Sequence, residues 1–457
     1  MSDTIFALSS GPAPAGIAVI RLSGPNALAA LQSLVTSPSD RAKCTPRPRH
    51  AHRRKLYRPN PEFIAGPIPG SEVLDDALIL FFPGPASFTG EDVVELHCHG
   101  GAATIAAVLQ ALGQYPDCRL AEAGEFSRRA FANGNMDLTE AEALSDLIAA
   151  ETEAQRRLAL RLATGAGHDR YQDWTDRLVR ILALIEAAVD FPEDDLPPDM
   201  LDQNANAIAS LIAEWEQDIR LGALSSAIRD GVRVAIVGSP NVGKSSLLNK
   251  LAGRDAAIVS EIAGTTRDVI EVRLDLGGYA VTLSDTAGLR DTPDAVEGEG
   301  VRRARATAES ADIILWVSDD PMVFDMPAPF GVLDTIPVFQ LLTKCDLVSA
   351  PSQWLDDPNR FGISSVTGVG LQDLLSAITS VCAERYGQAT AAVAVRARHR
   401  EALSRASEAL EASLAQPELA LSGEDIRVAL MEMGRITGRV DVETVLDVVF
   451  QEFCIGK

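Results

Sequence analysis

The stretch Val232-Arg-Val-Ala-Ile-Val-Gly-Ser-Pro-Asn-Val-Gly-Lys-Ser245 decides the fold of the central part of the chain. Its apolar first half predicts a buried strand, and residues 238–245 then match the phosphate-loop pattern GxxxxGK[ST]. Residues 246–251 predict the helix that this pattern requires. Glycines let backbone N–H groups surround a phosphate, and the helix N-terminus attracts its charge. We expect Lys244 to neutralise the β- and γ-phosphates during catalysis and Ser245 to bind Mg²⁺.

Further apolar runs predict strands in the same region. They alternate with helical patterns and cover residues 280–284, 313–317 and 338–342. Alternation of strands and helices implies a parallel sheet with helices on both faces. The middle of the chain, residues 229–381, is therefore expected to be a Ras-like P-loop α/β domain.

Two further motifs are typical of the switches of a GTPase. Asp285-Thr-Ala-Gly288 ends the second strand, so Asp285 can hold Mg²⁺ through water and the Gly288 amide can sense the γ-phosphate. Gly264-Thr-Thr-Arg-Asp268 offers a threonine hydroxyl that reaches Mg²⁺ only while the γ-phosphate is present. That dependence is the order–disorder switch of GTPases.

A third motif indicates that the base is guanine. Thr343-Lys-Cys-Asp346 follows another strand, and Asp346 can accept hydrogen bonds from the ring N–H and exocyclic amine of guanine. Adenine lacks that pair of donors. Ser364 and Ser365 fit the loop that closes on the base. Together the motifs predict GTP binding.

The regions flanking the middle domain have different patterns of predicted secondary structure. Residues 1–134 mix strand-like runs (17–22, 77–82 and 93–97) with a helical run at 102–112, which is an α+β pattern. Helical periodicity follows in residues 138–148, 178–189 and 201–221, and again from about residue 397. We predict a multidomain α/β protein with these parts: an α+β N-terminal domain (1–134), a discontinuous all-α helical domain (135–228 and 382–457) and the inserted GTPase domain (229–381).

The charge of the chain is acidic but unevenly spread. The 457 residues carry 41 Lys and Arg against 64 Asp and Glu, a net charge of −23. This balance argues against a protein that holds nucleic acid by overall charge. Residues 41–58 are the exception, with eight basic and no acidic residues. The segment is either a solvated loop or a local phosphate-contact patch.

Cysteine usage and hydropathy indicate a soluble protein of the cytoplasm. None of the six cysteines has CxxC spacing, so neither a zinc site nor a disulfide framework is implied. No signal-like N-terminus or apolar run of about 20 residues is present. His97-Cys98-His99 is a weak metal candidate, because alternate side chains of a strand face opposite ways.

The sequence resembles the MnmE (TrmE) family of tRNA modification GTPases over essentially its whole length. Within the GTPase motifs the resemblance rests on Pro240-Asn241, on Gly264–Asp268 and on Asp285–Arg290. The more specific matches lie elsewhere: Ser87-Phe-Thr-Gly-Glu-Asp92, His99-Gly-Gly101, Gly124-Glu-Phe-Ser127 and Phe453-Cys-Ile-Gly-Lys457.

The resemblance implies a particular route of hydrolysis. Leu289 stands where Ras-like enzymes carry a water-positioning glutamine, and Glu297 is the family's matching catalytic position. K⁺ is implied in place of an arginine finger when two GTPase domains meet, with Asn241, Ser260, Ile262 and Thr265 as ligands. The implied ligands of Mg²⁺ are then Ser245, Thr266 and Asp285. The full set of implied nucleotide contacts is Asn241, Val242, Gly243, Lys244, Ser245, Ser246, Ser260, Glu261, Ile262, Ala263, Gly264, Thr265, Thr266, Asp285, Thr286, Ala287, Gly288, Thr343, Lys344, Asp346, Ser364 and Ser365.

For the N-terminal domain the resemblance implies a folate-binding-like fold that carries 5-formyltetrahydrofolate or a related one-carbon derivative. Arg21, Glu95 and Lys457 are the matching contacts. The family usually has a lysine where this chain has Asn135, so one charged contact to the folate is lost. Arg128 or Arg129 is the candidate to replace it.

Two more positions need separate interpretation. Thr343 replaces the usual asparagine, and we expect its shorter side chain to lose the amide that braces the phosphate loop and the base. Cys454 is a catalytic thiol by resemblance to the family or, alternatively, a buried structural thiol. A lipidation signal is disfavoured because the final residues are Gly456 and Lys457.

By resemblance, the chain is a homodimeric, potassium-stimulated GTPase that forms a heterotetramer with the flavoprotein MnmG. The pair would modify carbon 5 of the tRNA wobble uridine. Two alternatives remain open at this point: a regulatory or ribosome-assembly GTPase without folate chemistry, and an interaction protein with a degenerate GTPase domain.

Overall fold

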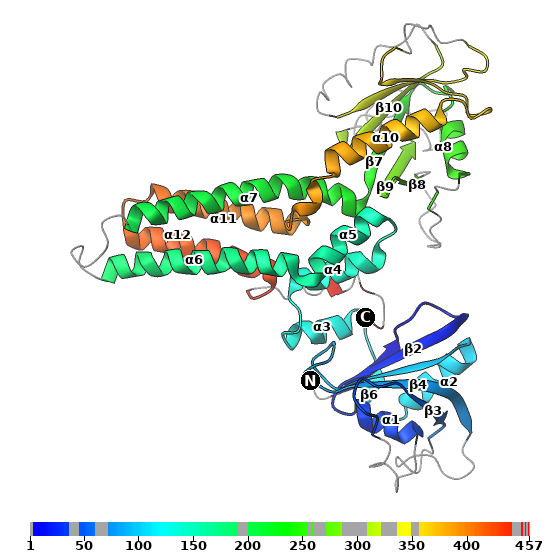
Figure 1. Ribbon diagram of the computed structural model, residues 1–457, viewed down its shortest axis with the longest axis vertical. Coiled ribbons are helices and arrows are strands. Elements are labelled where there is room, and N and C mark those ends of the chain that lie inside the picture. The colour runs from blue at the N-terminus through cyan, green and yellow to red at the C-terminus, as the bar shows by residue number, and fades with distance from the viewer. Residues whose placement is uncertain are drawn as a thin grey trace, which may run out of the picture. The chain divides into compact units, whose positions relative to one another are not determined.

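The computed structural model describes most of the chain (Figure 1). The described residues are 3–35, 45–59, 72–190, 200–254, 257–258, 271–285, 309–320, 336–348, 356–440, 449–450, 453 and 456. They fold into two compact units, which comprise residues 1–145 with 437–457, and residues 146–436. None of the helices described is long and apolar enough to cross a membrane.

The first unit is built on a six-stranded sheet in the order β3-β4-β5-β2-β1-β6. Its strands are β1 (Thr4–Leu8), β2 (Ala15–Ser23), β3 (His52–Tyr57), β4 (Val73–Phe82), β5 (Val93–Gly100) and β6 (Cys118–Leu120). All neighbours are antiparallel except β1 and β6. The three strands and the helix predicted here are confirmed.

One face of this sheet is apolar and the other is polar. Leu22 and Leu96 pack against α1 (Ala27–Val35) and α2 (Ala102–Leu112) in a single buried cluster. Arg21, Glu95 and His97 alternate with those core residues, so they lie on the opposite face. Cys98 is buried in the apolar cluster, which raises the pKa of its thiol to about 12.

The C-terminal residues that the structure describes also belong to the first unit. Val449, Phe450 and Phe453 form an apolar cluster with the start of α4 (Leu138–Ala149) and with Phe131 of α3 (Glu125–Ala132). The hydroxyl of Ser9 donates a 2.7 Å hydrogen bond to the carbonyl oxygen of Gly456. The end of the chain thus lies against the end of β1.

The second unit contains a group of long helices together with the short helix α5 (Figure 1). They are α5 (Glu153–Arg161), α6 (Gly167–Asp190), α7 (Met200–Asp230), α11 (Ala397–Ala415) and α12 (Leu419–Thr437). Tyr171, Trp174 and Trp215 are buried between them and meet edge to face. The predicted helical stretches are confirmed.

The same unit carries a second six-stranded sheet, in the order β12-β11-β10-β7-β9-β8. Its elements are β7 (Val232–Gly238), β8 (Glu271–Leu276), β9 (Tyr279–Asp285), β10 (Ile313–Ser318), β11 (Val338–Leu342), β12 (Arg360–Gly362), α8 (Lys244–Ala252) and α10 (Leu371–Tyr386). The four predicted strands form. The expectation of a purely parallel sheet is wrong, because β8 pairs antiparallel with β9. The sequence Glu271-Val-Arg-Leu-Asp-Leu276 alternates exposed and buried residues, as an antiparallel edge strand does.

Candidate functional site

The phosphate loop joins β7 to α8. β7 passes so close to β10 that a Cβ on Gly238 would lie 2.2 Å from the Val317 carbonyl oxygen. The loop then turns through two residues with positive φ, Asn241 (61°) and Gly243 (104°). Lys244 is buried, and its ammonium donates 2.8 Å hydrogen bonds to the carbonyl oxygens of Gly238 and Ser239. The ammonium therefore lies across the loop, at the N-terminus of α8, where an anion is favoured.

The base motif is tied directly to this loop. Thr343 is buried, and its hydroxyl donates a 2.5 Å hydrogen bond to the Val242 carbonyl oxygen. The ammonium of Lys344 donates a 3.2 Å hydrogen bond to the carbonyl oxygen of Asn241, the residue before Val242. Thr343 lacks the amide, as expected, but the phosphate loop is still braced, because a hydroxyl at this distance makes the contact with the loop.

Two carboxylates follow strands of the same sheet. Asp346 accepts a 2.7 Å hydrogen bond from the hydroxyl of Ser364, which follows β12. Asp319 follows β10 and accepts a 2.7 Å hydrogen bond from Lys344, which lowers the pKa of that carboxyl. Asp319 was not among the predicted site residues, although its place at the carboxyl end of a strand is a signal for such a residue.

Several predicted residues lie outside the described parts of the chain. They are Ser260, Glu261, Ile262, Ala263, Gly264, Thr265, Thr266, Thr286, Ala287, Gly288, Glu297, Cys454 and Lys457. Asp285 ends β9, with its backbone paired opposite Ile236 of β7. Ser245 and Ser246 begin α8 and are exposed, and Ser365 is half-buried beside Ser364. The structure brings together the phosphate loop, residues 343–346 and residues 364–365.

The first unit brings together two of the predicted folate contacts, Arg21 and Glu95, and places Asn135 beside the same aromatic residue. Arg21 lies opposite Glu95 in the sheet and donates two hydrogen bonds to its Oε1 atom, at 3.0 and 2.9 Å. The guanidinium carbon lies 5.6 Å from the ring centre of Phe88 and 5.8 Å from that of Phe126, within cation–π range. Asn135 donates to the carbonyl oxygen of Phe88 at 3.3 Å. Phe88 is the residue around which this group assembles.

Arg129, one of the two candidates to replace the lost lysine, is buried and already paired with carboxylates, which makes it unsuited to that role. Its side chain is only 1% exposed and forms ion pairs with Asp3, Glu91 and Glu125 at 3.0 to 3.1 Å. These bonds fix the start of the chain, the loop before β5 and the start of α3 to one another. Arg128 lies elsewhere, with its guanidinium 5.6 Å from the ring centre of Phe450.

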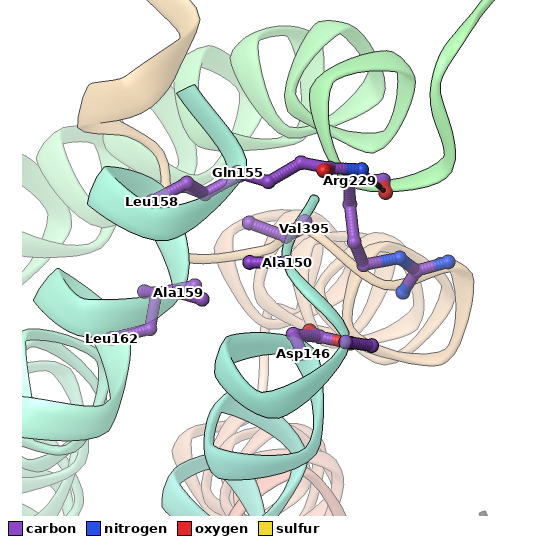
Figure 2. Close-up of a pocket in the computed structure, with 9 residues that line it drawn as sticks. Asp146, Ala150, Gln155, Leu158, Ala159, Leu162, Arg229 and Val395 are labelled. Carbon is purple, nitrogen blue, oxygen red and sulfur yellow. Dashed lines mark hydrogen bonds between the residues drawn. The ribbon is translucent and has the colours of Figure 1, made fainter. Parts of the chain in front are cut away.

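A small cavity of about 50 Å³ lies in the second unit, away from the nucleotide motifs (Figure 2). It lies where α5 faces the end of α7, and Gln155 there donates a 2.9 Å hydrogen bond to the Arg229 carbonyl oxygen. Most of its lining is apolar: Ala149, Ala150, Leu158, Ala159, Leu162 and Val395. It has room for a few waters but not for a nucleotide.

Comparison with known proteins covers nearly the whole chain. The TrmE N-terminus model (GTP-binding protein TrmE) matches residues 4–135, and the MnmE helical domain model matches residues 138–454. A tRNA modification GTPase MnmE from Rhodospirillum rubrum is 50% identical over 100% of this chain and 99% of its own length. The protein of the same name from Parvibaculum lavamentivorans is 49% identical over 100% of both chains.

The names of these relatives fit the sites described above, since a phosphate loop, a guanine motif and an N-terminal polar site occur in one chain. The helical-domain model and both full-length relatives carry the name MnmE, and together the two models cover nearly the whole chain. The chain therefore belongs to the MnmE family of tRNA modification GTPases.

Proposed function

We propose that the chain is a potassium-stimulated GTPase that acts with the flavoprotein MnmG on carbon 5 of the tRNA wobble uridine. The observation that carries this proposal is the bracing of the phosphate loop by the guanine motif, through Thr343 and Lys344. It supports a working nucleotide site rather than a degenerate one. Membership of the family supports the tRNA substrate.

In this proposal the chain's own residues hold the nucleotide while a cation completes the site. Lys244 lies across the loop that would hold the β- and γ-phosphates. The exposed Ser245, with Thr266 and Asp285, would bind Mg²⁺. Asn241 is exposed on a loop whose backbone Lys344 fixes, which suits a cation ligand, and Ser260, Ile262 and Thr265 would complete a K⁺ site. These cations supply positive charge beside the phosphates, and Glu297 would orient the attacking water.

The N-terminal unit would carry a one-carbon tetrahydrofolate, in a folate-binding-like fold. An aromatic ring beside paired polar groups suits a flat heterocycle with several donors and acceptors. Phe88 is partly exposed, and Arg21 and Glu95 retain partial exposure next to it. Asn135 and Lys457 would complete the site, and Cys454 would assist the tRNA chemistry.

The remaining features of the proposal concern assembly. The chain would form a homodimer through its N-terminal domain and a heterotetramer with MnmG in the cytoplasm. We retain the domain division at residues 1–134, 135–228, 229–381 and 382–457 as part of this proposal. Hydrolysis would open and close facing GTPase domains.

Hydrolysis measured at equal ionic strength in KCl and in NaCl tests the potassium site. We expect faster turnover in KCl, and Asn241→Ala should remove the difference because it removes a proposed ligand. Equal rates in both salts would show that K⁺ has no role. Glu297→Ala should hydrolyse more slowly than the unaltered chain while binding GTP equally well, and an unchanged rate would refute the assignment.

Nucleoside analysis of tRNA from a deletion strain tests the substrate. We expect the modified wobble uridines to disappear and to return when the unaltered gene is supplied. Unchanged wobble uridines in the deletion strain would refute the tRNA function, whatever the outcome of the hydrolysis measurements.

A further inference from the structure

We propose that the outer edge of the first unit's sheet contacts the phosphate backbone of tRNA. The surface, called here the β3 basic edge, consists of six residues: Arg47, Arg49, Arg53, Arg54, Lys55 and Arg58. The inference rests on the proposed function, since tRNA is then the substrate, but it concerns where the tRNA lies rather than what is done to it.

The basic residues are spread along one edge of the sheet, and those within β3 project to both sides of it, Arg53 and Lys55 on one face and Arg54 on the other. β3 ends the strand order, so β4 is its one neighbour among the strands that the structure describes. At one end the Arg49 N–H bonds the Phe81 carbonyl oxygen, and at the other the Arg58 N–H bonds the Glu72 carbonyl oxygen. These two partners, Phe81 and Glu72, are nine positions apart along β4 and the residue before it, so at about 3.3 Å per strand residue the two ends of the basic row lie about 30 Å apart. Such a row can follow an extended polyanion over several charges.

Most of this charge has no carboxylate partner. Arg53 pairs with Asp76 through two hydrogen bonds of 3.1 and 2.8 Å, and Arg58 pairs with Glu72 at 2.7 Å. Arg54 donates to a backbone carbonyl oxygen at 2.9 Å, which leaves its charge unneutralised. Over the residues that the structure describes, four members have no ion pair with a carboxylate: Arg47, Arg49, Arg54 and Lys55.

All four of these side chains belong to exposed residues. Charged residues on an edge strand also prevent pairing between sheets, but one or two lysines are enough for that. Here five of the six basic residues are arginines, whose guanidinium groups match phosphate oxygens bidentately. A chain of net charge −23 repels a polyanion, so contact with tRNA requires a local positive surface. The β3 basic edge meets that requirement.

The test is tRNA binding by the full chain at several salt concentrations. The variant R54E/K55E reverses two charges of the edge that form no close ion pair with a carboxylate among the described residues, although Lys55 lies opposite Asp76 in the sheet. The control R180E/R220E reverses two exposed arginines on α6 and α7, and it changes the net charge by the same amount. We expect the first variant to bind tRNA about tenfold more weakly, with the slope of log K against log salt reduced by about two. The control should keep both values near those of the unaltered chain.

Either of two results would overturn the inference. One is unchanged affinity and slope in R54E/K55E, which would leave an acidic protein partner as the remaining class of ligand. The other is an equal loss in both variants, which would show that binding follows net charge. GTP hydrolysis should be unchanged in both variants, which reports that each is folded.

Failure of the inference can be told apart from failure of the proposed function. If the unaltered chain restores wobble modification and R54E/K55E binds tRNA equally well, only the location is wrong. If the unaltered chain binds no tRNA and the deletion strain keeps its modified uridines, both the inference and the proposed function are wrong.

Discussion

The hydroxyl of Thr343 lies 2.5 Å from the carbonyl oxygen of Val242, a residue 101 positions earlier in the chain, and donates a hydrogen bond to it. This bond joins the strand end that would recognise the base to the loop that would hold the phosphates. A Cβ on Gly243, the next residue of the loop, would lie 3.7 Å from the same hydroxyl. The two halves of the nucleotide site are therefore held in one fixed arrangement.

Removing that hydroxyl should weaken nucleotide binding. Thr343→Val keeps the shape of the side chain but leaves a buried carbonyl oxygen without its donor, which costs roughly 1–3 kcal/mol. We expect the affinities for GTP and GDP to fall together, by about tenfold, in titrations with a fluorescent nucleotide. Thr343→Ser retains the hydroxyl and should bind like the unaltered chain. Equal affinities for the valine and serine variants would show that the bond does not support the site.

Base discrimination should depend on Ser364. Its hydroxyl holds Oδ1 of Asp346, and a freely rotating carboxylate would accept guanine's two donors less well. In Ser364→Ala we expect the preference for GTP over ITP, whose base lacks the exocyclic amine, to fall by about fivefold. Competition binding measures the ratio. The exposed Ser380→Ala on α10 should leave the ratio unchanged, and an unchanged ratio in Ser364→Ala would contradict the assignment.

Local sequence predicts the nucleotide-binding half of this molecule well. The strand at 338–342 has the predicted bounds, because a continuous apolar run is decided by burial, and the helix at 102–112 of the first unit has its predicted bounds too. β8 was not predicted, because half of its residues are charged and exposed. The Thr343 contact with Val242 could not be predicted either, since it depends on how two distant segments meet.

The burial of Arg129 also depends on how distant segments of the chain meet. From sequence alone, an arginine on a short helix is expected to be solvated or to bind a ligand, because charged side chains are rarely buried. Here three carboxylates from separate segments surround it: Asp3, Glu91 and Glu125. Local patterns carry no information on such long-range charge pairing, so a residue proposed for the folate proved to be part of the core.

This network predicts how acid affects the first unit. Burial alone would raise the pKa of Glu125, but hydrogen bonds from Arg119, the Glu122 N–H and Arg129 outweigh it and lower the pKa. A lowered pKa contributes stability above the unfolded value of about 4.3, and that contribution is lost as the pH falls through the folded value. Glu125→Gln should therefore destabilise the unit at pH 7 by roughly 3 kcal/mol, because Arg129 loses a buried partner.

Calorimetric unfolding of the full chain measures this effect. The deficit of Glu125→Gln relative to the unaltered chain should shrink as the pH is lowered below the folded pKa of Glu125, where its carboxyl is protonated in both states. The exposed Glu153→Gln, which removes a surface partner of Arg156 and Arg157, is the control and should leave the transition unchanged at pH 7. A deficit of Glu125→Gln that is independent of pH would contradict the electrostatic cause.

The docking of the chain's end should depend on Gly456. Its φ of 101° favours glycine, and a Cβ there would lie 2.1 Å from the carbonyl oxygen of Leu8. The clash is between backbone atoms, which cannot move aside as a flexible side chain can. Gly456→Ala should therefore release the end of the chain from Ser9 and β1. We expect faster digestion by a carboxypeptidase and, because Lys457 is a proposed folate contact, weaker binding of 5-formyltetrahydrofolate.

A matched control separates the clash from the backbone strain. Gly134 also has a positive φ, of 74°, but a Cβ added there meets nothing within 4 Å. Gly134→Ala therefore introduces similar backbone strain without displacing a neighbour. This variant should be digested by the carboxypeptidase at nearly the rate of the unaltered chain, and it should bind folate nearly as well. GTP hydrolysis should be the same in both variants, since the nucleotide motifs lie in the other unit. If Gly456→Ala digests no faster than Gly134→Ala, the contact with Leu8 does not hold the end of the chain in place, and any loss of folate binding needs another cause.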